Sequence, residues 1–353
     1  MLRNEVSMKI ESIGVRLPSR KVTNDDILQF LEDQSNGIAK PILKTYQRMV
    51  KGLLKLAGSD TRVICDTNKS ETAGAFIKGA ITDALEKSGR SKDDIDLMIY
   101  CGVGKGFLEP ANAYFYAKAM GMECSCFDIA DACMSWIRAL EISYEFLKSG
   151  RYRAIMIVNG EFNNNHGFPD NFVVKNLRQI EYTFPTYTIG EAATATIVVP
   201  SDREWKFKFK TLPQLCDLCT IPLDGYENYV EHTNRLAKNG LYNFVSYGRE
   251  MFANADKMLA PLVMEAVKDL NEPDIYFPHA ASDAAYLTAS KKIGLPQEKM
   301  YAKVFPLYGN LVSASIPTAM DMALSEGRLK RGHKVVFCPA SAGMVYGVVQ
   351  FVY

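Results

Sequence analysis

The order of secondary-structure patterns constrains the fold of this chain more than any other feature, because strand and helix patterns alternate twice along it. In the first half, the patterns occupy 72–88 (helix), 96–101 (strand), 111–120 (helix), 125–129 (strand), Cys133 to about Ser149 (helix) and 154–158 (strand). In the second half, they occupy 248–270 (helix), 274–277 (strand), 281–293 (helix), 313–326 (helix), 334–338 (strand) and 345–352 (strand). This repeated order predicts an α/β layered fold with two similar halves, of which the last two strands form an antiparallel pair.

The turn residues near Pro200 predict where one half ends and the other begins. We expect an N-terminal half over 1–200 and a C-terminal half over 201–353. Residues 33–60 do not follow the repeated order. They form a helical, lysine-rich stretch with Gly37, Pro41 and Gly58, which predicts an insertion or a lid.

Composition narrows the class of protein. The chain has 353 residues, of which 48% are hydrophobic and 23% charged, as in ordinary globular proteins. Its formal net charge of +1 gives no electrostatic basis for binding nucleic acid or an anionic membrane. The eight cysteines are scattered, no apolar run is long enough to span a bilayer, and the first residues lack a signal-peptide core. We therefore expect a cytoplasmic protein with reduced thiols.

One cysteine, Cys133, lies at a strand-to-helix junction, a position that is typical of reactive cysteines. Cys133 follows a strand pattern and small residues, and a helix pattern begins there. A thiol at a helix N-terminus is favoured as thiolate by the helix dipole and the free N–H groups. The alternative is a buried structural cysteine, which is the more common fate of this residue.

Three further segments accompany Asp131-Ala-Cys133-Met. They are Phe277-Pro-His279-Ala-Ala-Ser282, Tyr308-Gly-Asn310-Leu-Val-Ser-Ala-Ser-Ile-Pro317 and Pro339-Ala-Ser-Ala-Gly-Met-Val-Tyr-Gly347. In this order and spacing they resemble the β-ketoacyl-acyl-carrier-protein synthase III branch of the thiolase superfamily, from about residue 61 to the C-terminus. The resemblance implies a thiolase-like five-layer α-β-α-β-α sandwich built from two βαβ halves, and a homodimer.

The resemblance also implies a Cys-His-Asn active site. Cys133 would take an acyl group from a thioester. His279 and Asn310 would stabilise the enolate left when a malonyl- or β-ketoacyl-type thioester loses carbon dioxide, and the carbanion would attack the acyl-cysteine. The oxyanion would be bound by the backbone N–H groups of Cys133 and Ala342. Acyl-CoA and acyl carrier protein would be substrates and partners, with no separate cofactor and no metal.

The sequence departs from the family at several positions. Ser282 replaces an asparagine, Ala284 replaces an arginine that helps to dock the carrier protein, and Ser341-Ala342-Gly343 replaces a glycine triplet. On the same helix, Lys291 and Lys292 retain a basic docking surface. Residues 1–60 lack the tryptophan that stacks on the adenine of coenzyme A. These changes favour a specialised secondary-metabolite or lipid pathway over the initiation of fatty-acid synthesis.

Other functions are compatible with some of these residues. An acyltransferase would pass the acyl group from Cys133 to an oxygen, nitrogen or sulfur nucleophile, with His279 as general base. A non-enzymatic partner subunit would require a broken trio, and a cysteine hydrolase would not need the Asn310 motif.

Several weaker signals have simpler interpretations. Cys216-Asp-Leu-Cys219 has the spacing of a zinc site but no second pair nearby. The glycine-rich loop over 102–106 lacks the full nucleotide-binding pattern and predicts a substrate-tunnel loop. His166 and His232 are interpreted as loop or surface residues. The lysines of 40–55 are most simply a solvated helix face, and a carrier-protein contact is the alternative.

Overall fold

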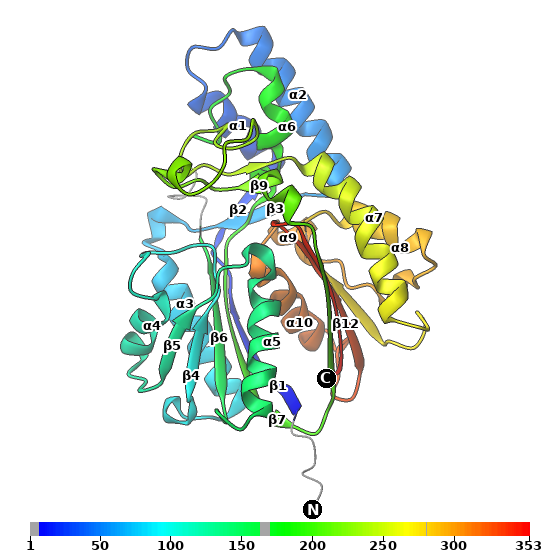
Figure 1. Cartoon of the computed structure of the whole chain (residues 1–353). Coiled ribbons are helices and arrows are strands. Elements are labelled where there is room, and N and C mark those ends of the chain that lie inside the picture. The colour runs from blue at the N-terminus through cyan, green and yellow to red at the C-terminus, as the bar shows by residue number, and fades with distance from the viewer. Residues whose placement is uncertain (1–6, 163–169, 280) are drawn as a thin grey trace, which may run out of the picture.

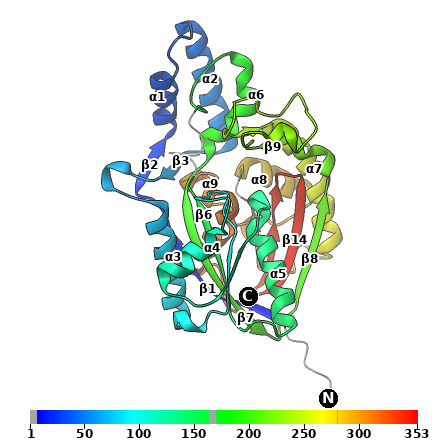
Figure 2. The same ribbon diagram turned by 60° about the vertical axis from the view of Figure 1, so that its left-hand side comes forward.

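The computed structural model describes residues 7–162, 170–279 and 281–353 and arranges most of them in five alternating layers of helix and sheet. Two sheets face each other across a central pair of helices, and further helices cover the outer face of each sheet (Figures 1 and 2). The strands of the first sheet all lie before residue 202, and those of the second all lie from Trp205 onward. The predicted α/β layered fold is confirmed.

The first sheet has the strand order β1-β7-β6-β4-β5. β4, β5 and β6 run parallel, whereas β7 is antiparallel to both of its neighbours. The strands are β1 (Ser7–Arg16), β4 (Leu97–Tyr100), β5 (Ser125–Asp128), β6 (Ile155–Glu161) and β7 (Ala192–Ser201). The outer helices are α3 (Ala73–Ser88) and α4 (Asn112–Met120). Every residue of β6 is buried, as expected for a central strand covered on both faces.

The second sheet is built around β14, which pairs antiparallel with β12, β8 and β13. Its strands are β8 (Trp205–Thr211), β11 (Ile275–Pro278), β12 (Lys334–Cys338), β13 (Ala340–Ser341) and β14 (Val345–Val352). The outer helices are α7 (Gly248–Ala266) and α8 (Asp283–Lys292). The terminal antiparallel pair is therefore confirmed. The helix predicted over 248–270 ends earlier, at Ala266, because Val267 has extended backbone angles.

The central layer consists of α5 (Ser135–Lys148) and α10 (Ser315–Ser325). Trp136 of α5 is 1% exposed, lies against the Phe337 ring and donates a hydrogen bond to the Thr196 hydroxyl at 3.0 Å. Trp136 therefore belongs to the core. Because both sheets bury one face against this layer, the largest hydrophobic cluster contains residues from both halves of the chain.

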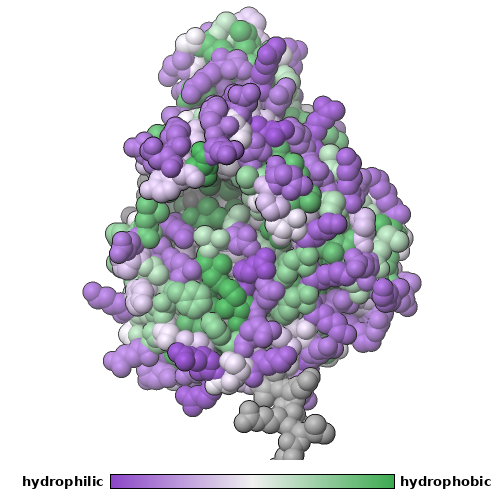
Figure 3. Space-filling view, viewed as in Figure 1, coloured by the Kyte–Doolittle hydropathy of each residue, from purple (hydrophilic) through white to green (hydrophobic). Residues whose placement is uncertain are grey.

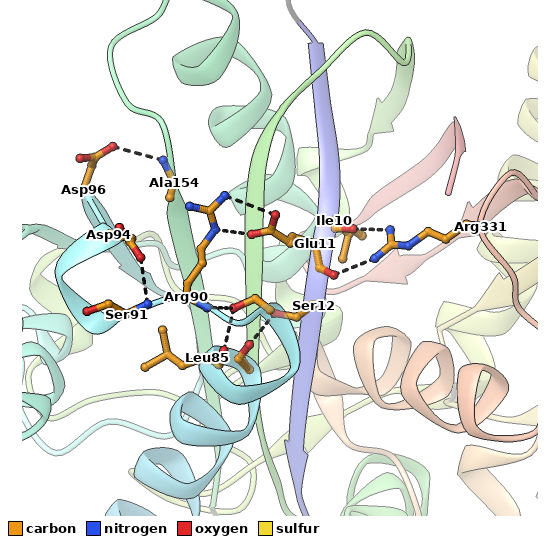
Figure 4. Close-up of polar contacts among 12 residues, drawn as sticks. Ile10, Glu11, Ser12, Leu85, Arg90, Ser91, Asp94, Asp96, Ala154 and Arg331 are labelled. Atoms are coloured by element: carbon orange, nitrogen blue, oxygen red, sulfur yellow. Dashed lines mark hydrogen bonds and ion pairs between the residues drawn. The ribbon is translucent and has the colours of Figure 1, made fainter.

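Hydrogen bonds connect the second half of the chain to β1, near the lower end of the molecule in Figure 1. The Arg331 guanidinium donates to the backbone carbonyls of Ile10 at 2.6 Å and Glu11 at 2.7 Å (Figure 4). The Glu11 carboxylate forms an ion pair with Arg90, which follows α3. The two halves are thus joined through β1 by hydrogen bonds as well as by the apolar core.

Residues of the predicted insertion over 33–60 belong to a larger projection above the layers, to which segments outside that range also contribute (Figure 1). It contains α1 (Asn24–Gln34), α2 (Lys40–Ala57) and α6 (Ile180–Thr183), and the short strands β2 (Arg20–Thr23) and β3 (Thr61–Ile64) lie at its base. The projection has its own hydrophobic cluster, in which the buried Tyr46 and Tyr187 hydroxyls are hydrogen-bonded at 2.9 Å. α2 ends at Gly58, which adopts the left-handed conformation (φ 76°) that glycine reaches without strain.

The remaining elements are short. They are β9 (Cys219–Thr220), β10 (Val245–Ser246), α9 (Val304–Tyr308) and 3-10 turns at Thr67–Lys69, Lys92–Asp94, Ala132–Met134, Leu177–Gln179, Phe184–Thr188, Pro213–Leu218, Tyr226–Asn228, Gln297–Lys299 and Val312–Ala314. Within the described ranges, no helix combines the length and the apolar character needed to cross a membrane.

Candidate active site

The segments singled out in the sequence meet at one edge of the two sheets. β4, β5 and β6 are parallel, so their C-terminal ends lie together, and Cys133 follows β5 while Glu161 ends β6. In the second sheet, β11 and β12 are parallel with Pro278 opposite Cys338. His279 follows β11 directly, and β12 leads into Ser341. The carboxyl ends of parallel strands are where α/β proteins commonly place their ligand sites.

Cys133 lies on a tight turn between β5 and α5. Residues Ala132–Met134 form a 3-10 turn, and Ala132 has φ 46°, a left-handed conformation that is costly for a residue with a side chain. Ser341, from the second half, accepts a hydrogen bond from the Met134 N–H at 3.1 Å. The turn that carries the thiol is therefore held by the loop predicted to complete the oxyanion site.

The charge state expected for Cys133 was wrong. Burial raises the pKa of the Cys133 thiol, and the neighbouring Cys219 and Glu161 raise it further, while a hydrogen bond from Ser341 opposes the shift. The sequence pattern predicted a thiolate because the helix appeared to begin at the cysteine. The regular helix begins only at Ser135, and the thiol lies beside other groups that can carry negative charge. The raised pKa favours the neutral thiol form of Cys133 at neutral pH.

His279 is a buried, neutral imidazole. It is 4% exposed, and burial lowers its pKa to about 4. At neutral pH the ring therefore carries one N–H and one free lone pair. Such a ring can donate a hydrogen bond to a carbonyl oxygen, or accept a proton from a thiol.

Asn310 is held by backbone contacts between the two halves. Its N–H donates to the Thr188 carbonyl at 2.8 Å, and its carbonyl accepts from the Gly190 N–H at 3.0 Å. Glycine is required at 190, because a Cβ there would lie 1.9 Å from the Tyr308 carbonyl oxygen. The Asn310 Oδ1 accepts from the Val312 N–H at 2.9 Å, so the amide Nδ2 keeps its donors; none of the hydrogen bonds among the described residues uses them.

Glu161 is a site residue that the sequence analysis missed. It is 1% exposed and accepts hydrogen bonds from the Val103 N–H at 3.1 Å, the Ser313 N–H at 3.3 Å and the Ser313 hydroxyl. Burial raises the pKa of Glu161 to about 7, while these hydrogen bonds oppose the shift. Since Ser313 follows Asn310 by three residues, Glu161 fixes the loop that carries the amide. The only sequence signal was a carboxylate ending an apolar strand.

The remaining predicted site residues lie in different places. Ala342 directly follows Ser341, which contacts the Cys133 turn. Lys291 and Lys292 are exposed in the last turn of α8, where Lys292 forms an ion pair with Asp256 at 2.7 Å. The backbone oxyanion site and the docking role of the lysines stay predictions.

Of the weaker signals, only Cys219 lies near the site: its partly buried thiol raises the pKa of Cys133. Cys216 and His232 are exposed. His166 lies outside the described residues. Among the residues that the structure describes, no group of three or more histidine, cysteine or acidic side chains is placed to hold a metal. All eight cysteines are free thiols.

The glycine-rich loop over 102–106 has a packing reason. A Cβ on Gly102 would lie 2.4 Å from the Gly160 carbonyl oxygen of β6. The loop therefore approaches β6 closely enough for the Val103 N–H to reach Glu161. Its predicted role as a tunnel wall stays a prediction.

Comparison with known proteins agrees with this arrangement. Residues 127–212 match the family model described as 3-oxoacyl-[acyl-carrier-protein] synthase III, and residues 264–353 match its C-terminal counterpart. The β-ketoacyl-[acyl-carrier-protein] synthase III of Clostridium acetobutylicum is 25% identical over 97% of each chain. That of Methylococcus capsulatus is 26% identical over 96% of this chain and 97% of its own.

Solved structures agree in fold. OleA of Xanthomonas campestris, in a cysteine-to-serine variant with bound lauric acid and lauroyl-CoA, superposes with a TM-score of 0.83 at 19% identity, over 98% of this chain and 99% of its own. The cerulenin-bound form of OleA gives 0.81 at 20% identity, over 99% and 97%. The chain is thus similar in sequence to β-ketoacyl-acyl-carrier-protein synthase III over a segment of each half, and it shares the fold of OleA.

Proposed function

We propose that the protein catalyses a decarboxylative Claisen condensation in two stages. In the first, the Cys133 sulfur attacks an acyl thioester, the carrier thiol leaves, and the acyl group remains on Cys133. In the second, a malonyl- or β-ketoacyl-type thioester loses carbon dioxide. The resulting carbanion attacks the acyl-cysteine, which forms a carbon–carbon bond and releases the Cys133 sulfur.

The observation that carries this proposal is the pair of neutral donors on the second half. A buried imidazole with a pKa of about 4 and an amide with unused N–H groups suit the stabilisation of an enolate oxygen. A hydrolase or a simple acyltransferase needs a base near the thiol but no second donor such as Asn310. In the first stage, the neutral His279 ring takes the proton of the Cys133 thiol and delivers it to the leaving thiolate.

The proposed oxyanion site for the acyl-cysteine consists of the Cys133 and Ala342 backbone N–H groups. The Met134–Ser341 hydrogen bond supports this assignment, because it brings the two loops together. We propose that the acyl groups arrive on coenzyme A or acyl carrier protein and that the enzyme works in the cytoplasm, where its free thiols stay reduced.

The test uses a purified acyl thioester and malonyl thioester labelled at the free carboxylate. We expect an acyl adduct on Cys133 by intact-protein mass spectrometry and release of labelled carbon dioxide with a β-ketoacyl product. The Asn310→Ala variant should keep the adduct and lose condensation. Acyl transfer to another nucleophile without release of carbon dioxide would instead favour the acyltransferase.

We also propose a homodimer formed along the edge of the first sheet. β5 is an edge strand there, and unpaired edges are commonly covered in native proteins. Beside it, Phe107 is 52% exposed, Tyr114 53% and Phe115 39%, which is unusual for aromatic residues on a free surface. Light scattering that gives only the monomer mass of 39.4 kDa would refute this proposal.

A further inference from the structure

The exposed surface of α2 carries a one-sided distribution of charge. Its five cations are all exposed, and no acidic residue occurs between Lys40 and Ala57. With 100° of rotation per residue, all five fall within an arc of about 80°. They are Lys40, Lys44, Arg48, Lys51 and Lys55. Since the whole chain has a net charge of only +1, this stripe is a local concentration of positive charge.

Most of these cations lack a strong partner. Lys51 pairs with Asp25 at 3.3 Å, although both side chains are largely exposed, and Arg48 contacts only the Thr45 hydroxyl at 3.2 Å. Within the described part of the chain, Lys40, Lys44 and Lys55 have no ion pair or side-chain hydrogen bond. Exposed charges of this kind add little to folding stability.

A second stripe lies beside the first. Ile42, Met49 and Leu56 are spaced by seven residues and are 39%, 39% and 73% exposed. They occupy an arc of about 40°, which borders the buried face of α2 on one side and lies about 80° from the cations on the other. Small residues, among them Gly52, separate them from the cations, and a Cβ on Gly52 would meet open space. An exposed helix face with an apolar seam along one border and cations along the other suits an acidic amphipathic helix.

The position of α2 connects this surface to chemistry. At its C-terminal end, the Ala57 carbonyl accepts a hydrogen bond from the Ser282 hydroxyl at 3.3 Å, three residues after His279. Thr61, just beyond α2, donates to the Leu307 carbonyl at 2.7 Å, three residues before Asn310. Figure 3 shows a hollow with hydrophobic residues between the projection and the lower body. A partner on α2 would therefore stand next to the segments that carry both donors.

We infer that the exposed face of α2, defined by its five cations and the seam of Ile42, Met49 and Leu56, is the docking site for an acidic carrier protein that delivers a thioester-linked acyl group. This inference rests on the proposed function. A membrane is the less fitting occupant, because a helix that lies in a lipid interface presents a wide apolar face with cations at its borders, and the seam here is narrow. The surface also lies on a different element from the lysines of α8.

The test compares a triple charge reversal on α2, K44E/R48E/K55E, with the control K148E/K206E/K330E, which reverses three exposed lysines outside α2. The donor is an acidic acyl carrier protein loaded with a medium-chain acyl group. A second donor, the corresponding N-acetylcysteamine thioester, has neither a carrier nor phosphates. Loading of Cys133 is followed by intact-protein mass spectrometry, and binding of the labelled carrier by fluorescence anisotropy.

We expect the α2 variant to weaken carrier binding and to raise the KM for the acyl carrier by at least about tenfold, and the control variant to do neither. Loading from the N-acetylcysteamine thioester should stay within about twofold in both variants, which shows that the site is intact. Salt should weaken carrier binding by the wild type and have less effect on the α2 variant.

Three outcomes would overturn the inference or separate it from the proposed function. Carrier kinetics and binding unchanged in the α2 variant would refute the docking site. Binding of phosphatidylglycerol vesicles that the variant loses, with no change toward the carrier, would assign the surface to a membrane. Carrier binding that depends on α2, with no loading of Cys133 from any thioester, would keep the docking site and reject the proposed function.

Discussion

Replacement of Glu161 by glutamine tests the assignment of this carboxyl as the group that fixes the Asn310 loop. In the folded protein both of its oxygens accept hydrogen bonds, from the Val103 N–H and from Ser313. Glutamine offers one oxygen and one NH2 group, so one buried N–H donor faces another donor. Loss of one acceptor for a buried N–H costs about 1–3 kcal/mol.

The charge of Glu161 makes this cost depend on pH. Its pKa is about 7 in the folded protein, against an ordinary value of 4.5, so the folded state favours the protonated form. Its contribution to stability is therefore complete below pH 4.5 and is lost as the pH rises through 7. Between pH 5 and pH 8 the loss is about 2–3 kcal/mol. Glutamine does not titrate, so the stability deficit of Glu161→Gln should shrink by about this amount over the same interval.

Urea unfolding of the wild type and the variant at pH 5 and pH 8 measures this difference directly. A Glu204→Gln variant serves as control, because the Glu204 side chain is 70% exposed in its ion pair with Lys206. Its deficit should stay below about 1 kcal/mol at both values of pH. An equal deficit for Glu161→Gln at pH 5 and pH 8 would refute the reasoning. In activity assays, condensation by Glu161→Gln should fall more than acyl loading, because the loop of Asn310 moves and the thiol stays.

Four further substitutions follow from the site geometry. Asn310→Ala should slow condensation by at least about a hundredfold and leave loading within a few-fold, measured by product formation and by mass spectrometry. Burial lowers the pKa of His279 from the ordinary 6.5 to about 4, so the contribution of its neutral ring to the free energy of unfolding is complete above pH 6.5 and is lost as the pH falls toward 4. The His279→Gln variant should not show this loss in urea unfolding curves. Ser341→Gly deletes a hydrogen bond that lowers the pKa of Cys133, so alkylation by iodoacetamide should need higher pH, and an unchanged profile would contradict the contact. Gly190→Ala places a Cβ 1.9 Å from a carbonyl oxygen and should cost about 2 kcal/mol or more in chemical unfolding; a stability equal to that of the wild type would disprove the close approach.

The layered fold could be predicted because the signals for its helices and strands lie within short stretches of sequence. The α3 helix, for example, has a capping Thr72, buried residues at helical spacing and a terminal Gly89, all within one short segment. The pairing of β1 with β7 could not be predicted in this way. Their partners are almost two hundred residues apart, and no local pattern records which strand lies beside which.

In the candidate site, too, the features set by local sequence could be predicted and those set by distant residues could not. Cys133, His279 and Asn310 could be proposed from the sequence because each lies in a segment with a recognisable order of small and polar residues, and the first two follow strands. The raised pKa of Cys133 was missed because it depends first on burial and then on Cys219 and Glu161, which come from other strands. A pKa reflects the whole environment of a group, which the neighbours in sequence do not define.

The neutral resting thiol has a consequence for how the enzyme survives between turnovers. Peroxides and other electrophiles react with thiolates far faster than with thiols, so Cys133 is shielded from oxidation and adventitious alkylation. In the proposed mechanism, the His279 ring accepts this proton when an acyl thioester is aligned for attack. Oxidative damage and the proposed catalysis would then require the same thiolate, which forms in the mechanism only when a substrate is bound.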